Sequence, residues 1–326
     1  MRKGFTLVEL LVVIAIMGMF LAMMIPAVQM SRETARRFTC MDNLHRIGLG
    51  MQQYHAVQWS FPPGVVDEQD PIRSLPQGKH LGWTVHLLPY LDHGVIYDHV
   101  DDDSVYSEAN ARVRSITVPE LQCPSSSGAI ESEAVPSCYA ACCGGQEGPI
   151  TSSLDGTFFL NSAVSDDDIP DGLGCTLLVS EKLIEQDDLG WMSGTRATLR
   201  NTSHAPDPRQ YKSPADRVPY YQPIPKGSPS PWDPKFELFE QQNQSTIEIP
   251  PESESEQEQA DESGEASSQP ERDPLYVGGF ASEHIDLVEA LMADGSVRTI
   301  SVMVDPEVFR RLGSRNDGEL LDPATF

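Results

Sequence analysis

The sequence predicts an α+β protein. We expect a long, kinked N-terminal helix whose first half is a membrane anchor. Its second half is the spine of a globular domain and packs on a small antiparallel β-sheet. Residues 5–25 form an apolar run that contains a single charged residue, Glu9. Apolar residues then recur at three- and four-residue steps over 38–55, the spacing of an amphipathic helix. Short apolar runs between Gly, Asp and Asn residues begin after Ser137 and are typical of strands.

The apolar run at 5–25 is predicted to cross a membrane. As a helix it would be roughly 31 Å long, enough for a bilayer core. It is longer than the apolar core of a cleaved signal peptide, and no small-residue cleavage box follows it. An ionised Glu9 inside hydrocarbon is costly, so it calls for a partner. Basic residues lie on both sides of the run, at 2–3 and 32–37, so the positive-inside rule leaves the orientation open.

The net charge of −26 over 326 residues limits the possible partners. A domain this acidic repels phosphates, so we expect no nucleic-acid partner. Residues 237–271 contain only acidic charges, among Ser and Gln, and hold no apolar run able to form a core. They are predicted to be a disordered insertion in a surface loop.

The expected elements follow the chain in order. The helix resumes after Pro26, with Ser31 as its cap, and ends at the turn that begins with Trp59. Residues 82–100 read as two short helical pieces around Pro89, and 108–116 as a weak helix.

Strands are expected later in the chain. The runs 157–160 and 176–179 are apolar and short. The segments 287–293 and 296–302, separated by Asp294 and Gly295, predict a hairpin with a type I′ turn. A short terminal helix is expected at 309–312.

Acidic residues at Asp166, Asp167, Asp168 and Asp171 raise the possibility of calcium, the one cofactor considered for this chain. The spacing of a calcium-binding EF-hand loop is missing. A solvated acidic loop, with Asp171 capping the next turn, is the preferred interpretation.

The chain has six cysteines: Cys40, Cys123, Cys138, Cys142, Cys143 and Cys175. An even number in an exported domain favours disulfides. A metal site is the alternative, but the spacing from 138 to 143 lacks the C-x2-C pairs of zinc ribbons, so no metal site is expected. These considerations leave the pairing open.

An enzyme is not expected. A Ser-His-Asp set could be assembled from His284, Asp294 and one serine of 125–127, but no Gly-x-Ser-x-Gly elbow is present. Asp294 is better explained by its turn.

Residues 2–9, Arg-Lys-Gly-Phe-Thr-Leu-Val-Glu, closely resemble the cleavage and methylation site of type IV prepilins and type II secretion pseudopilins. The resemblance implies that a prepilin peptidase cuts after Gly4 and methylates Phe5. It also implies that Glu9 pairs with the N-terminal amine of a neighbouring subunit during assembly. Pro26 falls where many pilins kink their helix.

The whole chain outside the acidic insertion resembles one large bacterial family of pilin-like proteins with a poorly characterised C-terminal domain. Its blocks here are Arg36-Arg37 with Cys40 to Leu44, Phe61 to Gly64, Leu88 to Leu91, Cys123 to Ser125, Asp171 to Glu181, and a terminal His-x9-Asp-Gly box of His284, Asp294 and Gly295. Since Cys40 and Cys123 lie in such blocks, we expect a disulfide between them. The four other cysteines, which the family pattern usually lacks, would pair among themselves.

These resemblances predict a processed, methylated pseudopilin-like structural subunit of a type II secretion or type IV pilus-like assembly. It would be a single-pass protein of the cytoplasmic (inner) membrane, with a cytoplasmic N terminus and a periplasmic or extracellular domain. Its partners would be the peptidase, the membrane and other pilin-like subunits. The alternative is a surface or periplasmic solute-binding module that uses the helix only as anchor. The expected divisions are a leader at 1–4, the assembly helix at 5–30, a globular domain at 31–236 and 272–326, and the insertion at 237–271.

Overall fold

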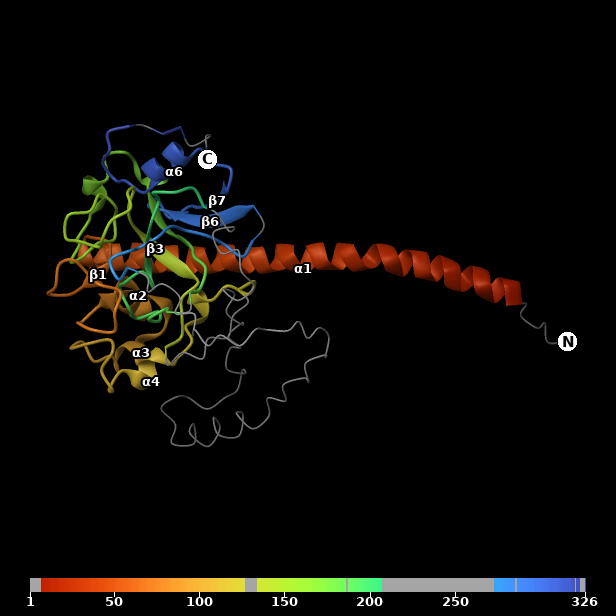
Figure 1. Cartoon of the computed structure of the whole chain (residues 1–326), viewed down its shortest axis with the longest axis horizontal. Coiled ribbons are helices and arrows are strands. Elements are labelled where there is room, and N and C mark those ends of the chain that lie inside the picture. Colours follow the sequence, from red (N-terminus) through yellow and green to blue (C-terminus); the bar gives the residue numbers. More distant parts are fainter. Residues whose placement is uncertain are drawn as a thin grey trace, which may run out of the picture.

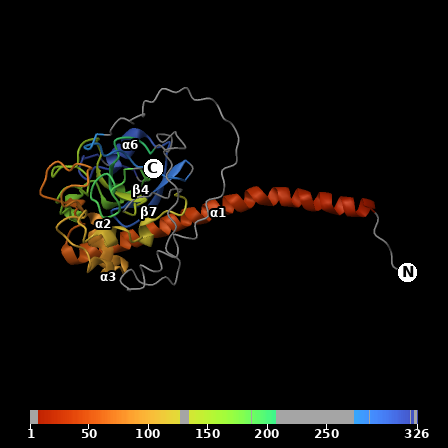
Figure 2. The same cartoon turned by 60° about the horizontal axis from the view of Figure 1, so that its bottom comes forward.

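One helix organises the molecule. The computed structural model describes residues 7–126, 134–185, 187–206, 273–284, 286–319, 321–322 and 326. Helix α1 spans Leu7–Gln58 without interruption. Its N-terminal half extends away from the domain, whereas its C-terminal half lies inside it (Figures 1 and 2).

The two halves of α1 have opposite environments. Large apolar side chains from Leu7 to Met30 are exposed, Leu7 by 78% and Met30 by 72%. In the second half a stripe is completely buried, formed by Cys40, Leu44, Ile47 and Met51. These residues are three or four apart and therefore share one helix face.

A five-stranded sheet packs on that face. Its strand order is β5-β3-β4-β6-β7, and its strands are β3 Tyr139–Gly144, β4 Leu177–Glu181, β5 Leu199–Asn201, β6 Leu287–Met292 and β7 Val297–Ser301. All neighbours pair antiparallel except β3 and β5, which are parallel. The sheet is therefore mixed, not purely antiparallel as the sequence predicted.

The sheet has a core on each face. Tyr139, Ala141 and Cys143 join the core on the α1 side. The alternate residues Ala140 and Cys142 join a second core. Helix α6, Pro306–Leu312, covers this second face with Phe309 and Leu312, and Figure 1 shows α6 and α1 on opposite sides of the strands.

Short elements cover the remaining side of α1. They are β1 Val65–Val66, β2 Leu81–Gly82, α2 Trp83–Leu87, η1 Leu88–Leu91, α3 Gly94–Tyr97, α4 Ala111–Arg114 and η2 Pro119–Leu121. Elements η1, α2 and η2 contact α1 directly. The predicted helical pieces at 82–100 and 108–116 are thus confirmed. Two further 3-10 turns, η3 Asp166–Asp168 and η4 Leu173–Cys175, precede β4.

Several local predictions need correction. The helix is continuous through position 26, so Ser31 is an interior residue and not a cap. Phe38 is 64% exposed, and Cys40 takes its place in the buried stripe. Residues 157–160 form only an isolated bridge at Leu160.

The β6–β7 hairpin is confirmed, but its turn is not type I′. That turn requires positive φ at both central residues. Here Gly295 has φ 83°, while Asp294 is not in the positive-φ region. Gly295 N donates to Met292 O, and Met292 N donates to Ser296 O, as in a three-residue loop closed by a glycine bulge. The acidic insertion predicted at 237–271 lies outside the described residues.

Candidate functional site

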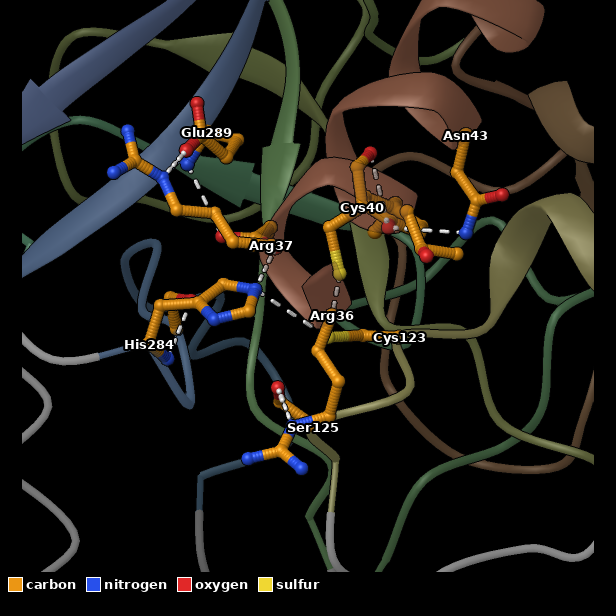
Figure 3. Close-up of polar contacts among 12 residues, drawn as sticks. Arg36, Arg37, Cys40, Asn43, Cys123, Ser125, His284 and Glu289 are labelled. Atoms are coloured by element: carbon orange, nitrogen blue, oxygen red, sulfur yellow. Dashed lines mark hydrogen bonds and ion pairs between the residues drawn. The ribbon is translucent and has the colours of Figure 1, made fainter. Parts of the chain in front are cut away.

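A group of charged residues of α1, which includes Glu33 and Arg37, lies where the exposed half of the helix enters the domain. Glu33, Arg37 and Cys40 are spaced by four and three residues, so they share the helix face that continues into the buried stripe. Side chains from the loop after η2, from β6 and from the segment before β6 meet this face (Figure 3). Glu181, at the end of β4, joins them.

Four potential donor side chains converge at this point: Cys40, Cys123, Glu181 and His284. Their nearest donor atoms all lie within 4.8 Å of one another, and all four residues are buried. The two Sγ atoms are 2.8 Å apart. His284 Nε2 lies 3.8 Å from Cys123 Sγ and 3.4 Å from Glu181 Oε1. Among the described residues, no other such group of three or more His, Cys, Asp or Glu side chains is found.

The other nitrogen of the His284 ring is fixed from α1. Nδ1 lies 2.7 Å from Glu33 Oε1, so a carboxylate accepts a hydrogen bond from this position. Glu33 in turn forms an ion pair with Arg36 and accepts from Ser125 Oγ at 3.3 Å. When His284 is charged, its Nε2–H faces Glu181 Oε1 at 3.4 Å. When the ring is neutral with its proton on Nδ1, the Nε2 lone pair points toward Cys123 and Glu181.

Glu181, the last residue of β4, is 2% exposed. Its Oε2 accepts the backbone N–H of Glu289 at 3.1 Å. Its Oε1 is buried and forms no hydrogen bond of good geometry within the described residues, although His284 Nε2 lies 3.4 Å away. A buried carboxylate oxygen without a donor is unfavourable.

A second polar contact joins α1 to the sheet beside this cluster. Arg37 Nε donates to Glu289 Oε1 at 2.5 Å, and Thr299 Oγ1 donates to Glu289 Oε2 at 2.9 Å. Arg37 Nη2 also donates to Thr299 at 2.7 Å. Glu289 is fully buried, so Arg37 compensates a carboxylate that water cannot reach.

Burial and mutual contacts shift the pKa values in the cluster. Burial alone would lower the pKa of His284, but its contacts with Cys123, Glu181 and Glu33 outweigh burial and raise this pKa to about 11. The contact with Cys40, together with burial, holds the pKa of Cys123 well above its usual range. For Glu33, burial would raise the pKa, but the hydrogen bonds from His284 and Arg36 lower it.

The order Cys123–His284–Glu33 is that of a nucleophilic triad, but the environment does not suit one. An activated cysteine needs a lowered pKa and access to substrate. Cys123 has a raised pKa and is 5% exposed. The Ser-His-Asp set considered from the sequence is not assembled either, since Asp294 Oδ1 accepts from Ser296 within its own turn.

The six cysteines all lie in the described residues, and all are free thiols, so the predicted disulfides are not confirmed. The structure does bring Cys40 and Cys123 together, as the predicted pairing requires. The other four do not form one group. Cys142 and Cys143 lie on opposite faces of β3, and Cys175 Sγ contacts Leu321 O.

The remaining predicted site residues are dispersed. His284 lies in the cluster, whereas Asp294 and Gly295 lie at the other end of β6, in the hairpin turn. In the acidic loop, Asp168 caps η3 through Ser165, and Asp171 accepts the backbone N–H groups of Asp317 and Gly318. Asp166 Oδ1 lies 3.4 Å from His55 Nε2, so three of the four carboxylates suggested for calcium already contact protein groups.

The N-terminal motif is only partly described. Gly4 and Phe5 lie outside the described residues, and Glu9 is an exposed residue in the first turn of α1. The 52-residue helix is long and apolar enough to span a membrane, and its most apolar window is entirely unburied.

Sequence reasoning missed Glu33 and Glu181 as members of the cluster. Glu33 looked like an ordinary first-turn residue of a second helix. Glu181 was recognised only as the end of a sequence block. A usable signal existed: Cys40, Cys123, Glu181 and His284 each belong to a different one of the blocks named above, and residues from separate blocks often meet in one place.

Comparison with family models gives two matches. Residues 29–307 match a family described as a protein of unknown function (DUF1559). Residues 1–25 match the prokaryotic N-terminal methylation motif. Searches of curated proteins and of solved structures give no significant match.

Proposed function

Because the chain belongs to the DUF1559 family and begins with a prokaryotic N-terminal methylation motif, we propose that it is a structural subunit of a type II secretion or type IV pilus-like assembly. The motif implies processing by a prepilin peptidase and a pilin-like subunit. Beyond this processing, we propose that the subunit assembles with other subunits through its N-terminal helix. We also propose that its N terminus is cytoplasmic and its domain exported.

The observation that supports this proposal best is the division of α1. Over roughly 36 Å of helix from Leu7 to Met30, the large apolar side chains that the structure describes are exposed, and the same helix continues without interruption into the buried core. An apolar surface of this length must be covered by lipid or by other helices. A rigid connection to the domain core suits a subunit that is first held in the membrane and then packed among neighbouring helices.

Processing can be tested by intact mass after co-expression with a prepilin peptidase. The mature chain is expected to begin at Phe5 and to carry one methyl group. Gly4→Leu should block cleavage, since the peptidase cuts after this glycine in the prepilins that the chain resembles. A wild-type chain that keeps residues 1–4 in the presence of active peptidase would contradict the proposal.

Assembly can be tested separately at Glu9. Glu9→Leu removes the cost of a carboxylate in hydrocarbon, at least a few kcal/mol, so insertion and cleavage should persist. Pairing of Glu9 with the N-terminal amine of a neighbour would be lost, and with it the axial offset between helices. Cysteine cross-linking between neighbouring α1 helices should therefore disappear in the variant. Undiminished cross-linking would favour the alternative, an anchored solute-binding module.

A further inference from the structure

We infer that Cys40, Cys123, Glu181 and His284 form a Zn²⁺ site that joins α1 to the β-sheet. The four side chains supply two sulfurs, one imidazole nitrogen and one carboxylate oxygen, all buried and all within 4.8 Å of one another. Zinc binds these ligand types in tetrahedral sites, and a buried site with four protein ligands is structural, not catalytic.

The orientation of His284 supports this assignment. In metal sites the imidazole commonly donates its second N–H to a carboxylate, which fixes the ring and its tautomer. Here Glu33 Oε1 lies 2.7 Å from Nδ1. Arg36 and Ser125 hold Glu33 in place. Nε2 is thus presented to the space between Cys123 Sγ and Glu181 Oε1.

Glu181 provides an independent observation. One of its oxygens is fixed by the N–H of Glu289, while Oε1 is buried, forms no hydrogen bond of good geometry among the described residues, and has His284 Nε2 3.4 Å away. A buried carboxylate oxygen is costly unless it is paired or coordinates a metal. A cation bound by the two sulfurs and by His284 Nε2 would supply the missing interaction.

Two of the observed separations suit a tetrahedral ion, and a third requires the two sulfurs to move apart. Bonds of about 2.3 Å to sulfur and about 2.0–2.1 Å to nitrogen and oxygen require S–N and N–O separations of about 3.5 Å and about 3.3 Å. The observed separations are 3.8 Å for Cys123 Sγ to His284 Nε2 and 3.4 Å for Nε2 to Glu181 Oε1. The two sulfurs, now 2.8 Å apart, would separate by about 1 Å. The two thiol protons and the Nε2 proton of His284 would leave to solvent as the thiolates and the imidazole bind the metal.

A disulfide between Cys40 and Cys123 is the competing arrangement. It would use the two sulfurs only, and a protonated His284 would remain between Glu33 and Glu181, with Nε2 3.4 Å from Glu181 Oε1. A metal would instead bring both sulfurs, His284 Nε2 and Glu181 Oε1 into one coordination shell, which is the arrangement we infer.

The site lies where the exposed half of α1 enters the domain. Its ligands come from α1, the loop after η2, strand β4 and the segment before β6. Zinc would therefore fasten the helix to three separate parts of the domain, at the end nearest the protruding segment. This role does not depend on which assembly the subunit joins.

The test uses the full chain, purified in detergent and equilibrated with Zn²⁺, followed by removal of free metal and elemental analysis. Wild type should retain about one zinc per chain, as a site with these four ligands implies. Cys40→Ser and His284→Gln should reduce retention at least tenfold. Cys142→Ser is the matched control, because Cys142 is equally buried but faces the other side of the sheet. The control should retain zinc like wild type.

Two further measurements keep the test decisive if a ligand variant fails to fold. Co²⁺ added to wild type should give the thiolate-to-metal and visible bands of a tetrahedral site. Glu33→Gln, which changes no ligand, should keep the stoichiometry and weaken zinc affinity about 10–100-fold. Wild-type protein that holds no zinc and yields a Cys40–Cys123 disulfide on non-reducing peptide mapping would overturn the inference. So would zinc retained by His284→Gln, or an unchanged affinity in Glu33→Gln.

Discussion

Removal of the Arg37 guanidinium should destabilise the domain far more than removal of an arginine whose carboxylate partner is exposed. In Arg37→Met the aliphatic stem remains, but Glu289, which is fully buried, loses the donor 2.5 Å from its Oε1. Of the side-chain donors in the described part of the chain, it then keeps Thr299 alone. Breaking a buried ion pair costs about 3–5 kcal/mol. Because Arg37 itself is 35% exposed, we expect the lower end, about 3 kcal/mol. At about 2–4 °C per kcal/mol for a domain of this size, Tm should fall by about 6–12 °C.

The assay is thermal unfolding of the full chain in detergent, followed by near-UV circular dichroism. Arg310→Met is the matched control, because Arg310 pairs with the half-exposed Glu307 on the surface of α6, and its Tm should stay near wild type. The double variant Arg37→Met, Glu289→Met should recover most of the loss, since no buried charge then remains uncompensated. A single variant within about 1 kcal/mol of wild type would refute the reasoning.

Two other predictions concern the domain core. Burial lowers the pKa of His86 in the folded chain to about 4, whereas a histidine in the unfolded chain has a pKa of about 6.5. Between pH 6.5 and pH 4 the unfolded chain therefore binds more protons than the folded chain. The free energy of unfolding should fall as the pH drops through this window. Denaturant titrations across this window should show that His86→Phe loses up to about 3 kcal/mol less free energy of unfolding than wild type. The same dependence of the unfolding free energy on pH in both proteins would contradict the assignment. A Cβ at Gly156 would lie 2.3 Å from the backbone carbon of Cys143, whereas one at Gly148 would meet nothing within 4 Å. Gly156→Ala should therefore cost about 1–3 kcal/mol or more and Gly148→Ala almost nothing in the same thermal assay, and equal stability of the two variants would show that the β3 backbone can yield.

Local physical signals explain which elements could be predicted from the sequence. The uninterrupted apolar run at 5–25 and the three- and four-residue spacing that follows it predict one long helix. The Asp294-Gly295 pair between two apolar runs predicts the β6–β7 hairpin. The exact turn was not predictable at this level, because Asp-Gly suits both a two-residue loop and a longer loop closed by a glycine bulge.

The buried stripe of α1 illustrates the limit of pattern reading. Phe38 fits the apolar periodicity but is exposed, while Cys40, two residues on, is buried. Periodicity shows which face of a helix is apolar, but not which residues at the edges of that face are buried. The position of the sheet against the helix decides which edge of the apolar face is covered. The parallel pairing of β3 with β5 likewise depends on a long connection whose path leaves no local mark.

By itself the sequence determined the N-terminal processing motif, the membrane-length helix and the α+β class, because each depends on residues that are neighbours in the chain. Only the tertiary structure decided that Glu33, Cys40, Cys123, Glu181 and His284 lie together. Between Cys40 and His284 lie more than two hundred residues, and the sulfur of one and the ring of the other meet through the packing of α1 on the sheet. Such a site is set by the geometry of that packing, which has no counterpart in the spacing of its residues along the chain.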